Sequence, residues 1–80
     1  MSPTHPSEKA LFITFSNTTQ AMNMEECCSK YGLPGQLVPV PRDIKASCGL
    51  AWKTTPEQKE PLAQMMKREK IRPEKFVLQP

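Results

Sequence analysis

The longest apolar run of the chain lies near its start and is typical of a buried β-strand. After Lys9, residues 10–15 read Ala-Leu-Phe-Ile-Thr-Phe, which is rich in residues that favour extended backbone. Successive side chains of a strand point to opposite faces of the sheet, so both faces of this strand should be covered. The pattern predicts a central strand over residues 9–15.

A helical spacing of apolar residues follows this strand. Asn17 together with Gln20 would cap the helix start, with Ser16 or Thr18 as the alternative capping residue. The helix should end at about residue 31, because Gly32 suits the left-handed position that follows a helix. The side chains expected to face the core lie three or four residues apart and are Ala21, Met24, Cys28 and Tyr31.

A second helix is indicated by its first residues. Residues 55–58 read Thr-Pro-Glu-Gln, with threonine as a cap and proline in the first turn. The helix should end near residue 70. Pro61 removes one backbone hydrogen bond, so the helix should either kink there or begin there. The side chains expected to face inward are Leu62, Met65 and Met66.

Three short strands complete the predicted elements, over residues 36–40, 49–53 and 75–78. Pro39 cannot donate a hydrogen bond to a neighbouring strand, so the strand that contains it should lie at an edge of the sheet. The resulting order βαββαβ is that of the ferredoxin-like α+β fold. We therefore expect a four-stranded antiparallel sheet in the order 4-1-3-2 with two helices on one face.

The domain prediction is a single ferredoxin-like domain over residues 9–80, preceded by a disordered lead-in over residues 1–8, where Pro3 and Pro6 stand among polar residues. Two helices can cover only one face of the sheet, whereas the first strand is apolar on both. Something apolar should cover the second face, and a homodimer is the simplest candidate.

Length and charge narrow the function classes. Eighty residues hold one small core, which favours carrying, binding or docking over a self-contained multi-step enzyme. The net charge of +3 is mild, and the predicted third strand has one aromatic residue instead of paired stacking aromatics, which argues against RNA binding. We see neither an apolar run of about 20 residues nor a signal peptide, so we expect no membrane partner and a cytoplasmic location.

The chain has three cysteines, and two of them are adjacent. Adjacent cysteines close a disulfide only with strain, so reduced thiols are expected. Zinc requires spaced ligand pairs, and the only histidine is His5, so neither a metal nor another cofactor is expected. Cys28 belongs to the buried helix stripe, whereas Cys27 lies at its margin and is the candidate for a second, partly exposed thiol.

Cys48 is the cysteine best placed for chemistry. Gly49 follows it at the start of the third strand, and Arg42 and Lys45 precede it in the same connection. A glycine allows close approach of the backbone and unusual backbone angles, and cations that fold back would favour the nucleophilic thiolate. These residues suit receipt and release of a sulfur atom as a persulfide by an at least partly exposed Cys48. The competing interpretation is a small buried residue that closes the turn.

Two motifs in this region resemble a known family. They are Val38-Pro39-Val40-Pro41-Arg42 and Ser47-Cys48-Gly49-Leu50-Ala51, which are specific as a pair and not singly. The earlier matching residues are Leu11-Phe12, Phe15-Ser16, Thr18, Ala21-Met22, Glu25 and Gly32. On these residues the chain resembles the selenium/sulfur carrier protein-like family of small bacterial domains, from residue 10 to about residue 78.

The resemblance implies that Cys48 is the carrier thiol and that Arg42 and Gly49 shape its loop. Sulfur or selenium would arrive from a cysteine desulfurase-like donor and pass to an acceptor enzyme. Two departures from the family pattern are Cys28, where a plain apolar residue is usual, and Pro61 in the second helix. The alternative function is an interaction or small-ligand regulatory module that acts through the sheet face or a dimer interface.

Overall fold

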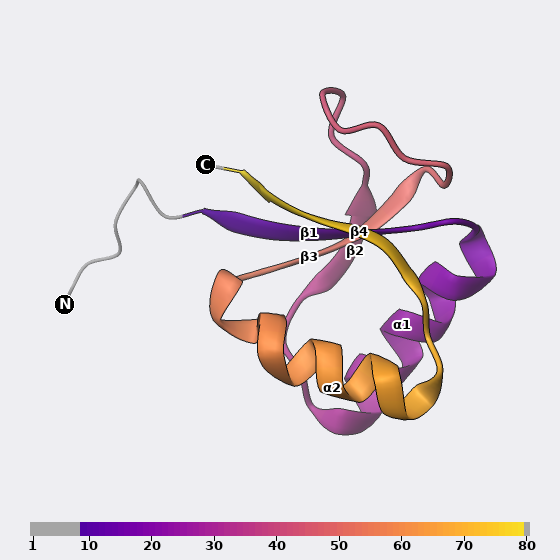
Figure 1. Ribbon diagram of the computed structural model, residues 1–80, viewed down its shortest axis with the longest axis vertical. Coiled ribbons are helices and arrows are strands. Elements are labelled where there is room, and N and C mark those ends of the chain that lie inside the picture. The colour runs from indigo at the N-terminus through magenta and orange to yellow at the C-terminus, as the bar shows by residue number, and fades with distance from the viewer. Residues whose placement is uncertain (1–8, 80) are drawn as a thin grey trace, which may run out of the picture.

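The computed structural model describes residues 9–79 and shows one sheet with both helices on the same face (Figure 1). The predicted α+β class, with a four-stranded antiparallel sheet and two helices, is confirmed. The lead-in predicted over residues 1–8 lies outside the described residues. The elements in chain order are β1 (Ala10–Phe15), α1 (Thr18–Tyr31), β2 (Gln36–Pro39), β3 (Leu50–Thr54), a 3-10 turn (Pro56–Gln58), α2 (Lys59–Glu69) and β4 (Pro73–Gln79).

The sheet has the order β2-β3-β1-β4, and every neighbouring pair is antiparallel. Read from the β4 edge, this order is 4-1-3-2. β1 is central, and β2, which contains Pro39, lies at an edge as that proline predicts. The pairing of β1 with β4 is irregular between Thr14 and Phe15, where the register shifts.

The main core fills the space between the sheet and the helices. The expected inward residues of α2 and all but one of those of α1 are buried. The exception is Tyr31, which is 38% exposed. Tyr31 is the last residue of α1, and its hydroxyl donates a hydrogen bond to the half-buried Glu69 of α2 instead of turning into the core.

The local sequence predicts the cap of α1 correctly and the cap of α2 incorrectly. Asn17 caps α1, because its side-chain oxygen accepts a hydrogen bond from the amide of Gln20 at 2.9 Å. The predicted Thr55 cap is wrong, since its side chain makes no capping hydrogen bond and a 3-10 turn intervenes before α2. Pro61 is the third residue of α2, so the helix does not begin there. Amides in the first turn have no partner within the helix, and Pro61 therefore removes none of its hydrogen bonds.

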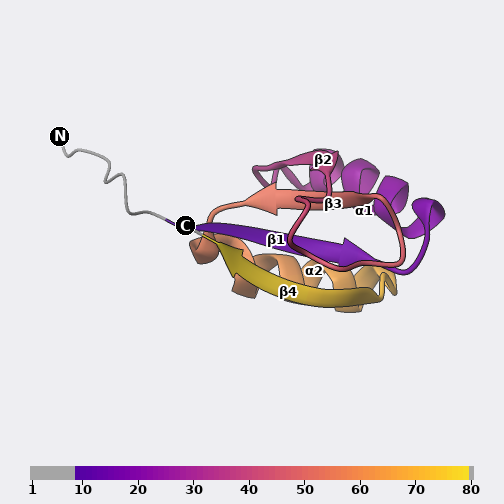
Figure 2. The ribbon, with the colours of Figure 1, turned by 90° about the horizontal axis from the view of Figure 1, so that it is seen from above.

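The second face of the sheet is partly covered by the connection between β2 and β3. Ile44 of this connection is 8% exposed and packs with Phe12 of β1 and Ala51 of β3. Figure 2 shows the connection lying across β3 and β1. The chain itself thus provides part of the expected apolar cover, and the homodimer stays a prediction.

Candidate functional site

Cys48 lies two residues before β3, beside the first turn of α1. Its sulfur is 3.9 Å from the hydroxyl oxygen of Thr18, the first residue of α1. The backbone amide of Leu50 donates a hydrogen bond to the same sulfur at 3.4 Å. Donated hydrogen bonds and the positive end of a helix dipole both favour negative charge on a sulfur atom. The Cys48 sulfur therefore faces one donated hydrogen bond and the start of α1.

The expected exposure of Cys48 is wrong, because the residue is 6% exposed and belongs to the main core. The reason is the alternation of side chains in β3. Leu50 and Trp52 pack into the same core, and Cys48 continues their two-residue spacing onto the face that the helices cover. The turn-closing interpretation therefore describes the resting position of the side chain correctly.

The predicted supporting residues are placed differently from what was expected. Arg42 and Lys45 are exposed, and within residues 9–79 neither forms a hydrogen bond or ion pair with Cys48. Gly49 has no positive φ, and a Cβ atom there would meet nothing within 4 Å. The special backbone angles predicted at Gly49 are therefore absent.

A contact that the sequence did not reveal holds the residue before Cys48. The amide of Ser47 donates to one oxygen of Glu74 at 3.1 Å, and its hydroxyl donates to the other oxygen at 2.7 Å. These bonds, from the Ser47 hydroxyl first and its amide second, hold the pKa of the Glu74 carboxyl below its usual value. Glu74 is the second residue of β4, so this contact ties the Cys48 segment to the sheet edge.

The other two thiols have surroundings that oppose the thiolate. Burial, and then the neighbouring Cys27, raise the pKa of Cys28 to about 12. Partial burial, followed by the charge of Glu69, raises the pKa of Cys27. All three cysteines are free, as expected, and Cys28 belongs to the core as its place on the helix stripe indicated. Cys27 is half-buried, and its raised pKa disfavours the nucleophilic thiolate.

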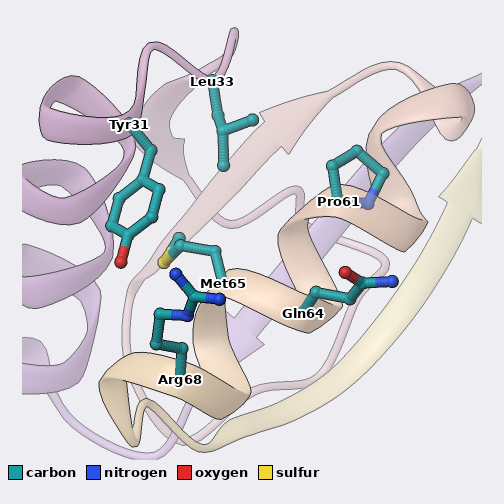
Figure 3. Close-up of a pocket in the computed structure, with 6 residues that line it drawn as sticks. All are labelled: Tyr31, Leu33, Pro61, Gln64, Met65 and Arg68. Atoms are coloured by element: carbon teal, nitrogen blue, oxygen red, sulfur yellow. The ribbon is translucent and has the colours of Figure 1, made fainter.

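A separate hollow of about 240 Å³ lies between the end of α1 and one side of α2 (Figure 3). Four of its residues come from one stripe of α2, and two come from the end of α1 and the residues after it. They are Tyr31, Leu33, Pro61, Gln64, Met65 and Arg68. The lining combines apolar side chains with the Tyr31 phenol, one guanidinium and one amide, which would suit a small ligand with both an apolar and an acidic part.

Two further findings concern the described part of the chain. No cluster of three or more His, Cys, Asp or Glu side chains suited to a metal ion is found among residues 9–79. Over the same residues, neither helix is long and apolar enough to cross a membrane.

Comparison with protein families gives one match. A family model described as "Putative Se/S carrier protein-like" matches residues 10–78, which span both helices and nearly all of the sheet. No curated protein and no solved structure matches the chain.

Proposed function

Because this chain belongs to the Se/S carrier protein-like family, we propose that it carries a sulfur or selenium atom on Cys48 and passes it between partner enzymes. The observation that carries the choice of residue is the hydrogen-bond environment of the Cys48 sulfur, which faces an amide of β3 and the start of α1. For Cys27 and Cys28, burial raises the pKa of the thiol, which disfavours the thiolate.

The proposed loading step is a transfer of one sulfane atom. The Cys48 thiolate attacks the terminal sulfur of a donor persulfide, R–S–SH, and the bond between the two donor sulfurs breaks. The products are a Cys48 persulfide and the donor thiolate, R–S⁻, so no external oxidant or reductant is consumed. Release to an acceptor thiolate is the same exchange in reverse, and selenium would follow the same course.

The proposal includes the setting of this chemistry. The donor is a cysteine desulfurase-like enzyme, the acceptor is a second enzyme, and the setting is the bacterial cytoplasm, where thiols remain reduced. We assign the fold to the ferredoxin-like class on its βαββαβ order and antiparallel sheet. Such a carrier needs no cofactor, since the thiol itself holds the cargo.

Intact mass spectrometry tests the proposal directly. The protein is incubated with a cysteine desulfurase and cysteine, and the wild type is compared with Cys48→Ser and with Cys27→Ser as a matched control. We expect the wild type and Cys27→Ser to gain the mass of one sulfur, removable by dithiothreitol, and Cys48→Ser to gain none. Serine preserves an acceptor for the Leu50 amide, and a far-UV circular dichroism spectrum checks that the variant folds. A gain that survives in Cys48→Ser, or no gain in any protein, would refute carriage on Cys48.

The hollow beside α2 supports a second candidate, a module that binds a small ligand without using Cys48. The second sheet face, an alternative docking surface, is partly occupied by the β2–β3 connection, and the hollow beside α2 has the Arg68 guanidinium as a partner for an acidic ligand. The test is a thermal-shift screen of small carboxylates with wild type, Arg68→Ala and Cys48→Ser. Stabilisation that is lost in Arg68→Ala and kept in Cys48→Ser would favour this function.

A further inference from the structure

The buried position of Cys48 creates a problem of access for a carrier. A donor must bring its terminal sulfur into contact with the Cys48 sulfur, yet the residue is 6% exposed and packs in the main core. Cys48 therefore has to leave the core during loading, or the whole domain has to unfold. The inference below rests on the proposed function and concerns the regulation of its site.

We infer that the Ser47–Glu74 contact is a latch, and that its release lets residues 47–49 swing outward and present Cys48 while the rest of the fold stays intact. The latch consists of the two hydrogen bonds from Ser47 to the Glu74 carboxylate, at 3.1 and 2.7 Å. Both residues are exposed, so water or a partner's side chain can compete for these bonds.

The neighbours of Cys48 offer little other resistance to this movement. Ser47 and Gly49, on either side of it, are both exposed, and Gly49 has no side chain to withdraw from the protein. The remaining ties are the contacts of the sulfur with Thr18 and Leu50 and the hydrogen bond from the Val40 amide to the Gly49 carbonyl at 3.0 Å. Local opening therefore breaks a handful of polar contacts and removes one small side chain from the core.

The rest of the connection can stay in place during this movement. Ile44 packs between Phe12 and Ala51 on the second face of the sheet, three residues before the latch. The side-chain amide of Gln79 donates a hydrogen bond of 2.8 Å to the Asp43 carboxylate, which holds the same part of the connection against β4. These anchors make the moving part short and keep Ile44 packed on the second face.

Cys28 provides an internal reference for the test. It is 1% exposed in the last turn of α1, so it reacts with a reagent only when that part of the helix leaves the core. Local opening at the latch exposes Cys48 and leaves Cys28 protected, whereas global unfolding exposes both. The ratio of the two labelling rates within one molecule separates the two routes.

The experiment is native-state labelling of the full chain with iodoacetamide, followed by digestion and quantification of each labelled cysteine. We expect Glu74→Ala to speed labelling of Cys48 by about tenfold, as for loss of one to two ordinary hydrogen bonds, and to leave the Cys28 rate unchanged. Ser47→Ala removes one of the two bonds and should give a smaller acceleration in the same direction. Glu57→Ala, which replaces an exposed glutamate of the 3-10 turn, is the matched control and should change neither rate.

Two outcomes would refute the proposal that this contact is a latch. One is a Cys48 rate that does not change in Glu74→Ala, and the other is an equal acceleration of Cys48 and Cys28, which would mean global destabilisation. If Ser47 and Glu74 act through one contact, the double variant should label no faster than Glu74→Ala. Because labelling needs no sulfur donor, these results are independent of the persulfide measurement, and either proposal can fail without the other.

Discussion

Gly35 provides the sharpest test of how this fold is packed. Its φ is +137°, which side chains rarely allow, and a Cβ built there would lie 2.4 Å from the indole nitrogen of Trp52. It would also lie 2.8 Å from the carbonyl oxygen of Lys53. Gly35 therefore permits β2 to begin directly over the Trp52 ring, and Gly35→Ala should be strongly destabilising.

The magnitude follows from the two faults that alanine introduces. A residue held at an unfavourable positive φ costs about 1–3 kcal/mol. Forcing the backbone and the buried ring apart costs about 1–3 kcal/mol more. The sum, about 2–6 kcal/mol, compares with about 3–5 kcal/mol of total stability for a domain of this size. We expect Gly35→Ala to lose a large part or all of its stability at 25 °C.

The other two glycines supply matched controls. Gly32 has φ +70° with nothing within 4 Å of a built Cβ, so Gly32→Ala should cost only the backbone strain, about 1–2 kcal/mol. Gly49→Ala should lie within about 0.5 kcal/mol of wild type, because neither fault applies there. Urea unfolding followed by the fluorescence of Trp52, the only tryptophan, measures all three variants. A Gly35→Ala protein no less stable than Gly32→Ala would refute the close-approach argument.

Three further predictions concern single side chains. Asn17→Ala should lower the free energy of unfolding by about 1 kcal/mol, while Thr55→Ala, which loses no capping bond, should change it far less; urea unfolding compares them. Because folding lowers the pKa of Glu74, its contribution to stability is present above the ordinary value of 4.5 and is lost as the pH falls through the folded value. Wild type should therefore lose more stability than Glu74→Gln on acidification, and parallel acid dependences would contradict this. The hydrogen bond to Glu69 raises the pKa of Tyr31, so absorbance titration should show Tyr31 ionising at lower pH in Glu69→Gln than in wild type.

The sequence was sufficient for features that depend on local periodicity. The apolar run of β1, the cap at Asn17 and the left-handed Gly32 each follow from a few neighbouring residues, and the structure has all three. Pro39 correctly indicated an edge strand, because a residue without an amide donor is tolerated where one side of the strand has no partner. The prediction at Thr55 failed because a capping motif expresses only a local preference. Residues 56–58 form a 3-10 turn, which separates Thr55 from the start of α2.

The site was less predictable because its contacts join distant parts of the chain. Ser47 and Glu74 are 27 residues apart, and no local pattern announces their pairing. The burial of Cys48 had a usable signal, the shared two-residue spacing with Leu50 and Trp52. The position of Cys48 in a connection with nearby cations favoured an exposed side chain instead. The prediction followed this position rather than the two-residue spacing. For a residue at a strand end, alternation is the stronger guide to orientation.

The central position of β1 has a consequence for how the chain acquires its shape. β1 pairs on one side with β3 and on the other with β4, where Ala10 lies opposite Gln79. A ribosome that has released only the first half of this sequence has therefore made the middle strand of a sheet before either of its partners. Folding must wait for distant segments to meet, which slows it relative to a helical bundle of equal length. During that interval the most apolar strand of the protein is exposed, and chaperones or aggregation compete for it.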